Sequence, residues 1–169
     1  RPAMASRRNW RALRPGWEGG SARRVLVLCH GNICRSPTVE RLLRRSIERA
    51  EVVSAGFHAT AGREPPPGWA ALVSDALGID ISDHRSKVVD QTMLAWADIV
   101  LVMDTANWRA LRRHFPSSLA KAVLLGAMRP RSILSNLNIA DPYDADEPAM
   151  RSVARRLQDE VAELIATVD

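Results

Sequence analysis

Residues 25–169 alternate between short apolar runs and longer segments in which apolar residues recur every three or four positions. The short runs predict buried strands at residues 25–28, 51–54, 98–103 and 122–125. The longer segments predict amphipathic helices at residues 37–50, 69–77, 105–114 and 147–168. Strand and helix in this order predict an α/β fold, in which helices cover both faces of a small four-stranded parallel sheet. Residues 55–68, rich in Gly and Pro, are expected to form a surface loop.

The segment between the first predicted strand and the first predicted helix reads Cys29-His30-Gly31-Asn32-Ile33-Cys34-Arg35-Ser36-Pro37. A serine followed by a proline is a typical helix start, with the hydroxyl as N-cap and the proline at the first helical position. The loop must therefore turn sharply and end at a helix N-terminus, where backbone N–H groups and the helix dipole favour an anion. Gly31 and Asn32 are residue types that easily adopt the left-handed backbone angles of such a loop.

Cys29 and Arg35 stand at the two ends of this loop and determine its chemistry. A guanidinium matches two phosphate oxygens with a planar pair of donors, and it stays charged. Donors around a thiol favour its thiolate form, and the hydroxyl of Ser36 can donate to that thiolate. The spacing therefore predicts a phosphate-binding loop with a cysteine nucleophile.

The loop allows three other interpretations. Cys29 can be an ordinary buried apolar residue, as most free cysteines are. Together with His30 and Cys34 it can ligate zinc, but four ligands are needed and the chain has no second Cys/His pair. ATP binding is disfavoured, because the Gly-Lys-Ser/Thr of nucleotide-binding loops is missing. The neighbouring residues favour phosphate over all three, and we expect no metal and no cofactor.

The net charge of +5 is confined to the first 24 residues. Residues 1–24 hold seven arginines and one glutamate (net +6), whereas residues 25–169 hold 17 basic and 18 acidic side chains (net −1). We expect an Arg-rich flexible or loosely docked arm, or a leader, at 1–24 and one domain at 25–169. Such an arm can bind nucleic acid or anionic lipid, but nothing in the near-neutral domain supports that function.

Composition fits a single globular domain in a reducing compartment. The chain has 169 residues, 46% of them hydrophobic and 25% charged, and no apolar stretch reaches the length of a membrane span. Both cysteines lie in the loop, so no disulfide framework supports the fold. This cysteine usage predicts a cytoplasmic location.

The loop resembles the signature of the low-molecular-weight protein tyrosine phosphatases, and a distant motif strengthens the resemblance. That family places its general acid in an Asp-Pro-aromatic motif, and this chain has Asp141-Pro142-Tyr143. Shorter similarities are Ser54-Ala55-Gly56, His84-Arg85-Ser86 and Val102-Met103-Asp104. The resemblance extends from Val25 to the C-terminus. It implies a flavodoxin-like fold and a phosphatase domain at 25–169.

The resemblance implies a mechanism through a cysteinyl-phosphate at three catalytic residues. Cys29 attacks phosphorus, Arg35 and the loop amides hold the phosphate oxygens, and Asp141 protonates the leaving phenolate and then activates water. Asp-Pro is also a common turn opener, so Asp141 alone has a structural alternative. The residues expected to bind phosphate and substrate are His30, Gly31, Asn32, Ile33, Cys34, Ser36 and Tyr143.

Supporting roles are also implied. Ser54 and His84 would hold the loop in a hydrogen-bond network with Asn32, although each of the three could equally be an ordinary turn or surface residue. Cys34 could form a disulfide with Cys29 on oxidation, or it could simply pack.

Substrate choice is narrowed by the same comparison. Related arsenate reductases use further cysteines downstream, and this chain has none after Cys34. Arginine-phosphate phosphatases of this fold tend to carry threonine where Ile33 stands, which favours phosphotyrosine over phosphoarginine. Residues 57–60 lack the Trp or Tyr of eukaryotic members, as in the bacterial enzymes that act on tyrosine kinases of polysaccharide export. A phosphoprotein-binding module without turnover is the remaining alternative, and the complete set of Cys29, Arg35 and Asp141 argues against it.

Overall fold

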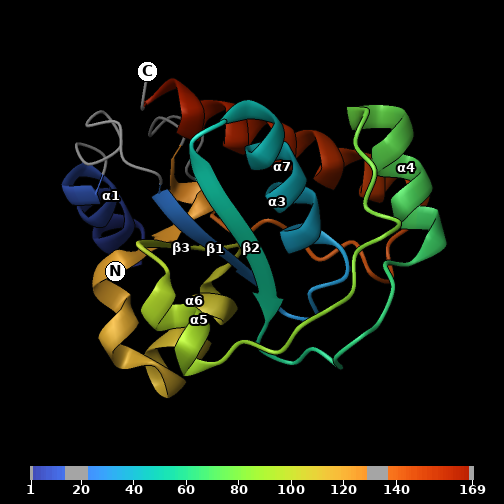
Figure 1. Cartoon of the computed structure of the whole chain (residues 1–169). Helices are drawn as coiled ribbons and strands as arrows, with labels where there is room; N and C mark the ends of the chain where they lie inside the picture. Colours follow the sequence, from blue (N-terminus) through green and yellow to red (C-terminus); the bar gives the residue numbers. More distant parts are fainter. Residues whose placement is uncertain (1, 14–22, 129–136, 168–169) are drawn as a thin grey trace.

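A four-stranded parallel sheet lies between two layers of helices in the computed structural model, which describes residues 2–13, 23–128 and 137–167 (Figure 1). The strands are β1 (Arg23–Cys29), β2 (Ala50–Gly56), β3 (Ile99–Val102) and β4 (Ala122–Leu124), in the order β2-β1-β3-β4. All neighbouring strands are parallel. The helices are α1 (Pro2–Leu13), α3 (Arg35–Ser46), α4 (Pro67–Leu77), α5 (Gln91–Trp96), α6 (Thr105–His114) and α7 (Glu147–Ala166). Two 3₁₀ turns, η1 (Pro116–Lys121) and η2 (Leu125–Ala127), flank β4. The predicted α/β fold is confirmed.

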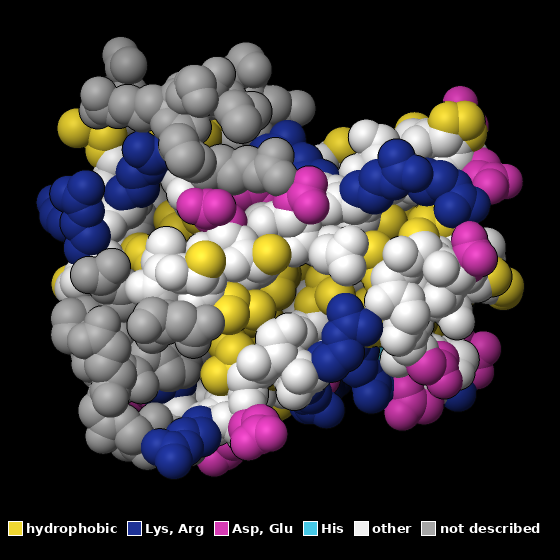
Figure 2. Space-filling view, turned by 90° about the horizontal axis from the view of Figure 1, so that it is seen from above, with side chains coloured by type: hydrophobic (Ala, Val, Ile, Leu, Met, Phe, Trp, Pro, Cys, Tyr) yellow, Lys and Arg dark blue, Asp and Glu magenta, His cyan; other side chains and the backbone are white. Residues whose placement is uncertain are grey.

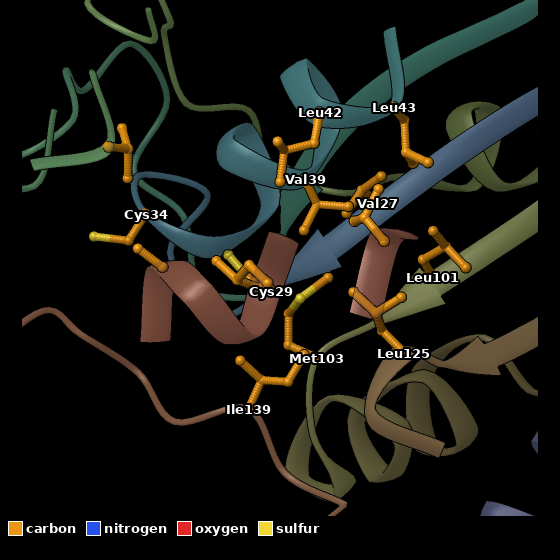
Figure 3. Packing of buried hydrophobic residues seen from close by; sticks show 14 of the residues in the cluster. Val27, Cys29, Cys34, Val39, Leu42, Leu43, Leu101, Met103, Leu125 and Ile139 are labelled. Carbon is orange, nitrogen blue, oxygen red and sulfur yellow. The ribbon is translucent and has the colours of Figure 1, made fainter. Parts of the chain in front are cut away.

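The sheet is buried on both faces because its strands are almost entirely apolar. Side chains alternate between the two faces along a strand, so Val25 and Val27 of β1 face one core while Leu26 and Leu28 face another. The first core packs under α3, α4 and α7, and the second under α5 and α6 (Figure 1). Figure 3 shows the first core, where Val39 and Leu42 of α3 lie beside Val27 of β1. Because all four strands are parallel, their carboxyl ends lie together at one edge of the sheet.

The first helix of the domain begins earlier than its sequence predicts. It starts at Arg35 instead of Pro37 and ends at Ser46 instead of Ala50, because Ala50 already belongs to β2. The expected N-cap role of Ser36 is wrong: Cys34 occupies that position without a capping side-chain bond. The hydroxyl of Ser36 is instead directed to the thiol of Cys29, at 3.0 Å. Other boundaries agree closely, and Gly78 closes α4 with φ of 64° as expected from its sequence position.

Residues 2–13, expected to belong to a flexible or loosely docked arm or a leader, form α1 and pack on the edge of the sheet beside β4. The Asn9 amide donates to the carbonyls of Leu119 and Ala122, at 2.7 and 2.8 Å. The backbone N–H of Leu124 donates to the hydroxyl of Ser6, at 2.7 Å. These short polar side chains satisfy backbone groups of an edge strand that would otherwise be open. Arg23 and Arg24, also assigned to the arm, begin β1, and residues 14–22 lie outside the described residues.

The outer surface over α3 and α7 carries an apolar groove (Figure 2). Its floor includes Leu42, Val161 and Ile165, and Arg45 lies on its border. The groove has a volume of about 380 Å³. Because α3 runs away from the carboxyl end of β1, this groove lies toward the opposite edge of the sheet from Cys29. No helix within the described ranges is long and apolar enough to cross a membrane.

Candidate active site

Cys29 is the last residue of β1 and lies at the carboxyl end of the sheet. Ligand sites of parallel sheets form at this edge, where the strands end and their loops begin. Its thiol is buried, and it accepts a hydrogen bond from the backbone N–H of Asn32, at 3.2 Å. The hydroxyl of Ser36 lies 3.0 Å from the same sulfur. Figure 3 shows Cys29 at the tip of the β1 arrow, beside Met103 and Ile139. The sulfur therefore accepts from one backbone donor and lies against a hydroxyl that can donate to it.

Asn32 holds the catalytic loop, residues 29–35, from behind. It is the one non-glycine with positive φ among the described residues, at 54°, whereas Gly31 does not adopt the left-handed conformation expected of it. The Asn32 amide donates to the hydroxyls of Ser36 and Ser54, both at 2.9 Å. Its oxygen accepts from the backbone N–H of Lys87, at 2.8 Å. Every polar atom of this fully buried side chain is thus bonded.

His84 and Glu40 extend this network. Nε2 of His84 lies 2.8 Å from the carbonyl of Asn32, and because a carbonyl only accepts, this nitrogen carries the proton. Burial lowers the pKa of His84 against the opposing effects of that hydrogen bond and of the Glu40 carboxylate. The hydroxyl of Ser54 donates to the buried carboxylate of Glu40, at 2.5 Å, and Arg44 pairs with the same carboxylate, at 2.8 Å. Ser54 and His84 are predicted here from the sequence, whereas Glu40 is not; its signal in the sequence is that it is the one acidic residue of an otherwise basic helix.

Gly56 allows the catalytic loop to lie directly on the end of β2. A Cβ atom at this position would stand 2.7 Å from the carbonyl oxygen of His30 and 2.9 Å from the nitrogen of Asn32. The backbone N–H of Phe57 also donates to the carbonyl of Cys29, at 3.1 Å. Only a residue without a side chain permits this approach, because both neighbours are backbone atoms.

Arg35 lies in the first turn of α3 with its guanidinium at the bottom of the site, 2% exposed. Nη1 donates to Asp104, at 2.7 Å, and to the carbonyl of Ile139, at 2.9 Å. Nη2 donates to Asp141, at 2.7 Å. Burial acts to lower the pKa of Arg35, but the negative charges of Cys29, Asp141 and Asp104 outweigh it, so that its pKa is raised. Its Nε is buried and has no hydrogen-bond partner among the described residues.

Asp141 reaches the loop from a segment more than a hundred residues downstream. Its carboxylate is 44% exposed and spans two contacts, with Oδ2 on Arg35 and Oδ1 accepting the backbone N–H of Tyr143 at 3.2 Å. Tyr143 is half exposed beside it. The Asp-Pro-Tyr motif thus faces the catalytic loop, where the sequence analysis expected it.

These side chains line one pocket of about 220 Å³. The lining residues are Cys29, His30, Gly31, Ile33, Cys34, Arg35, His58, Arg63, Asp141 and Tyr143. His58 and Arg63 were missed in the sequence analysis; the His58 ring packs on that of His30, with centroids 4.7 Å apart. Asn32 and Ser36, expected to bind phosphate, do not line the pocket. Their side chains lie beneath the loop and support it instead.

Cys34 lies in the pocket lining as a second, buried thiol. Its pKa is raised chiefly by burial, and also by the negative charges of Asp141 and Cys29. Both cysteines are free. In the part of the chain that the structure describes, no group of three or more His, Cys, Asp or Glu side chains could hold a metal ion.

A buried thiol, a guanidinium and a carboxylate that converge on one pocket are the groups that cysteine-dependent hydrolysis of a phosphate ester needs. Residues 24–169 match the sequence model of the family described as low molecular weight phosphotyrosine protein phosphatase. The chain therefore belongs to the low-molecular-weight protein tyrosine phosphatases, which are hydrolases with a flavodoxin-like fold.

Individual relatives agree with this membership and are bacterial. The chain is 35% identical to a probable low molecular weight protein-tyrosine-phosphatase, EpsP, of Ralstonia nicotianae, over 79% of this chain and 88% of that protein. The crystal structure of the tyrosine phosphatase AmsI of Erwinia amylovora superimposes with a TM-score of 0.78 at 29% identity, covering 88% of this chain and 94% of that one. The YwlE arginine phosphatase of Geobacillus stearothermophilus superimposes with a TM-score of 0.76 at 28% identity, covering 85% and 91%.

Proposed function

We propose that this chain hydrolyses phosphotyrosine in proteins, with Cys29 as nucleophile, Arg35 as phosphate ligand and Asp141 as general acid and base. One observation carries the proposal. Cys29, Arg35 and Asp141 line one pocket on the carboxyl edge of the sheet, and Nε of Arg35 is buried without a partner among the described residues. A phosphoryl group placed there would contact all three.

In the first step the Cys29 thiolate attacks phosphorus in line, which forms the S–P bond and breaks the P–O bond to the tyrosine. The donors on this sulfur, the N–H of Asn32 and the hydroxyl of Ser36, hold the thiolate before attack. They also stabilise it when it departs in the second step. Because the network beneath the loop fixes both donors, they need no rearrangement during the reaction.

Arg35 would stabilise the charge that develops on the phosphoryl oxygens. Its guanidinium is held on one side by Asp104 and the carbonyl of Ile139. This leaves Nε, and Nη2 once it leaves Asp141, as a parallel pair of donors for two oxygens. A buried donor without a partner gains the most from such a bond, because its desolvation is already complete.

Asp141 changes partner when phosphate binds. In the structure its carboxylate is paired with Arg35, whereas the acid role needs that carboxyl to face the leaving oxygen. A phosphoryl group that takes over Nη2 removes this pairing and frees the Asp141 carboxyl to turn to the leaving group. Asp141 then donates its proton to the leaving phenolate. In the second step it accepts a proton from the water that attacks the cysteinyl-phosphate, releasing inorganic phosphate.

The pocket wall supports an aromatic substrate. Ile33 lines the pocket with an apolar side chain, and the half-exposed ring of Tyr143 lines it as well. Phosphoarginine is the second candidate, because the YwlE arginine phosphatase is similar in structure to this chain. Its guanidinium would have to lie against the side chain of Ile33, which offers no hydrogen bond. Phosphotyrosine therefore fits better.

We place this activity in the bacterial cytoplasm, where thiols stay reduced, and take a tyrosine kinase of polysaccharide export as its phosphorylated partner. The free state of both cysteines is consistent with that compartment. The partner follows from the family resemblance of the loop at residues 57–60 to bacterial members. Neither nucleic acid nor lipid is needed for the reaction.

The test is release of phosphate from phosphotyrosine, phosphoarginine and phosphoserine peptides by wild type, Cys29→Ser and Asp141→Asn. We expect activity on phosphotyrosine alone, none with Cys29→Ser, and a loss in Asp141→Asn that grows as the leaving group becomes more basic. Hydrolysis by Cys29→Ser at the wild-type rate would refute the nucleophile. A preference for phosphoarginine would favour the second candidate.

A further inference from the structure

Arg63 stands at the mouth of the pocket and belongs to neither sequence motif of the site. It lies in the loop between β2 and α4, and its side chain is part of the pocket lining. Its guanidinium carbon lies 5.9 Å from the centroid of the Tyr143 ring, and Nη2 donates to the Tyr143 hydroxyl at 3.4 Å. Arg63 therefore borders the same opening as the ring that flanks the substrate.

The backbone of Arg63 is fixed relative to the catalytic loop. Its N–H donates to the hydroxyl of Ser86 and its carbonyl accepts the N–H of Ser86, both at 2.9 Å. Ser86 stands between His84 and Lys87, the two residues that bond Asn32. The segment from His84 to Lys87 therefore bonds both Asn32 in the catalytic loop and Arg63 at the opening of the pocket.

The guanidinium of Arg63 has no carboxylate partner among the described residues, unlike those of Arg41 and Arg85. Arg41 pairs with Asp83 at 2.6 Å and Arg85 pairs with Glu64 at 2.7 Å. Asp141, the acidic residue of the pocket lining, is already bonded to Arg35. A cation at the opening thus stays available for an anion that comes from outside.

A phosphotyrosine peptide would bring that anion to the rim. A pocket of about 220 Å³ has room for a phosphorylated ring but not for the residues on either side of it. Those residues must remain at the mouth, where Arg63 lies. A carboxylate there would meet the planar donors of a guanidinium, which suit it well.

We propose that Arg63 is a specificity-determining residue that selects phosphotyrosine substrates with an acidic side chain next to the phosphotyrosine. This inference rests on the proposed function and adds the class of peptide that the site prefers. Tyr143 has a part in it, because the contact with its ring and hydroxyl directs the Arg63 side chain along the opening.

The experiment compares three phosphotyrosine peptides that differ only in the residues flanking the phosphotyrosine, which are Glu, Gln or Lys. The ratio of kcat/KM for the Glu and Gln peptides is measured within each variant, so any effect on phosphate binding itself cancels. The variants are Arg63→Gln, Arg63→Glu and Arg63→Lys. Arg112→Gln is the control for net charge, because Arg112 is an exposed residue of α6, on the other face of the sheet.

Wild type is expected to prefer the Glu peptide by about twofold to fivefold for each carboxylate engaged, the range of an exposed ion pair. The ratio should fall as salt is added. Arg63→Gln should bring the Glu/Gln ratio to about one. Arg63→Glu should bring it below one and make the Lys peptide the best substrate of the three. Arg63→Lys and Arg112→Gln should keep the preference for the Glu peptide.

Equal rates on the Glu and Gln peptides in wild type, or a ratio unchanged in Arg63→Glu, would overturn the inference while leaving the proposed function intact. If wild type hydrolyses none of the three peptides, the proposed function fails, and this inference fails with it.

Discussion

Replacing Asn32 tests whether the network beneath the catalytic loop is what holds the nucleophile in place. The Asn32 side chain is fully buried and makes three hydrogen bonds, to Ser36, Ser54 and Lys87. Its backbone is left-handed, with φ of 54°. Asn32→Ala removes the three bonds, leaves their partners unsatisfied, and puts a Cβ-bearing residue without a local polar side chain into that conformation.

The size of the effect follows from these contacts. Each lost hydrogen bond costs about 1 kcal/mol net, so three cost about 3 kcal/mol. Alanine in the left-handed region adds about 1 kcal/mol. We therefore expect Asn32→Ala to lower the free energy of unfolding by about 4 kcal/mol. Asn32→Gly loses the same bonds without the backbone strain, so it should lose about 3 kcal/mol.

Urea unfolding at pH 7 gives the two free energies, and hydrolysis of p-nitrophenyl phosphate under native conditions gives kcat. Both variants should lose kcat, because the Asn32 N–H and the Ser36 hydroxyl no longer hold the sulfur. If Asn32→Ala unfolds within about 0.5 kcal/mol of wild type and keeps its kcat, the network does not hold the loop and the reasoning is refuted.

Three further predictions concern the surroundings of the loop. Burial lowers the pKa of His84, so the unfolded chain binds a proton at this residue more readily than the folded chain does. The contribution of His84 to the free energy of unfolding should therefore be full above about pH 6.5 and fall as the pH drops below it. Urea unfolding measured across pH should show this slope in wild type and lose it in His84→Gln. Gly56→Ala should lower the free energy of unfolding by about 1–3 kcal/mol and reduce kcat, since the new Cβ would lie 2.7 Å from a backbone atom. Gly68→Ala, which has open space around its Cβ, is the control and should not destabilise the protein. Equal unfolding midpoints for the two variants would contradict this. Because the pKa of Cys34 is raised, folded Cys29→Ser should resist iodoacetamide at pH 7 and react once unfolded; rapid labelling of the folded variant, measured by mass spectrometry, would count against it.

The parts of the site that could be predicted from the sequence are those whose residues stand close together along the chain. The loop from Cys29 to Arg35 contains both the thiol and the guanidinium of the pocket, and the apolar strand before it and the helix after it fix its place at the edge of a parallel sheet. Asp141 could be predicted because the Asp-Pro-Tyr motif is a local pattern, although it lies more than a hundred residues from the loop. The core strands could be predicted equally well, since the residues of β1 from Val25 onward are apolar on both faces.

The residues that sequence analysis missed owe their positions to tertiary contacts. Arg63 lies in a Gly/Pro-rich loop without periodicity, and only its bonds to Ser86 bring it to the pocket. α1 was missed because its buried face mixes polar and apolar residues: Ser6 and Asn9 pair with backbone groups, and Trp10 is its one buried large apolar side chain. The N-cap role of Ser36 was wrong because the Cys29 thiol takes up its hydroxyl.

The central claim is that phosphate passes through the sulfur of Cys29, and trapping the intermediate tests it most directly. A ³²P-labelled phosphotyrosine peptide is mixed with enzyme and quenched within milliseconds, and the labelled residue is mapped by mass spectrometry. The account predicts one phosphoryl group on Cys29 and none in Cys29→Ser, with release of the peptide preceding release of phosphate. Label on any other residue, or turnover with no label on the protein at any time point, would contradict it.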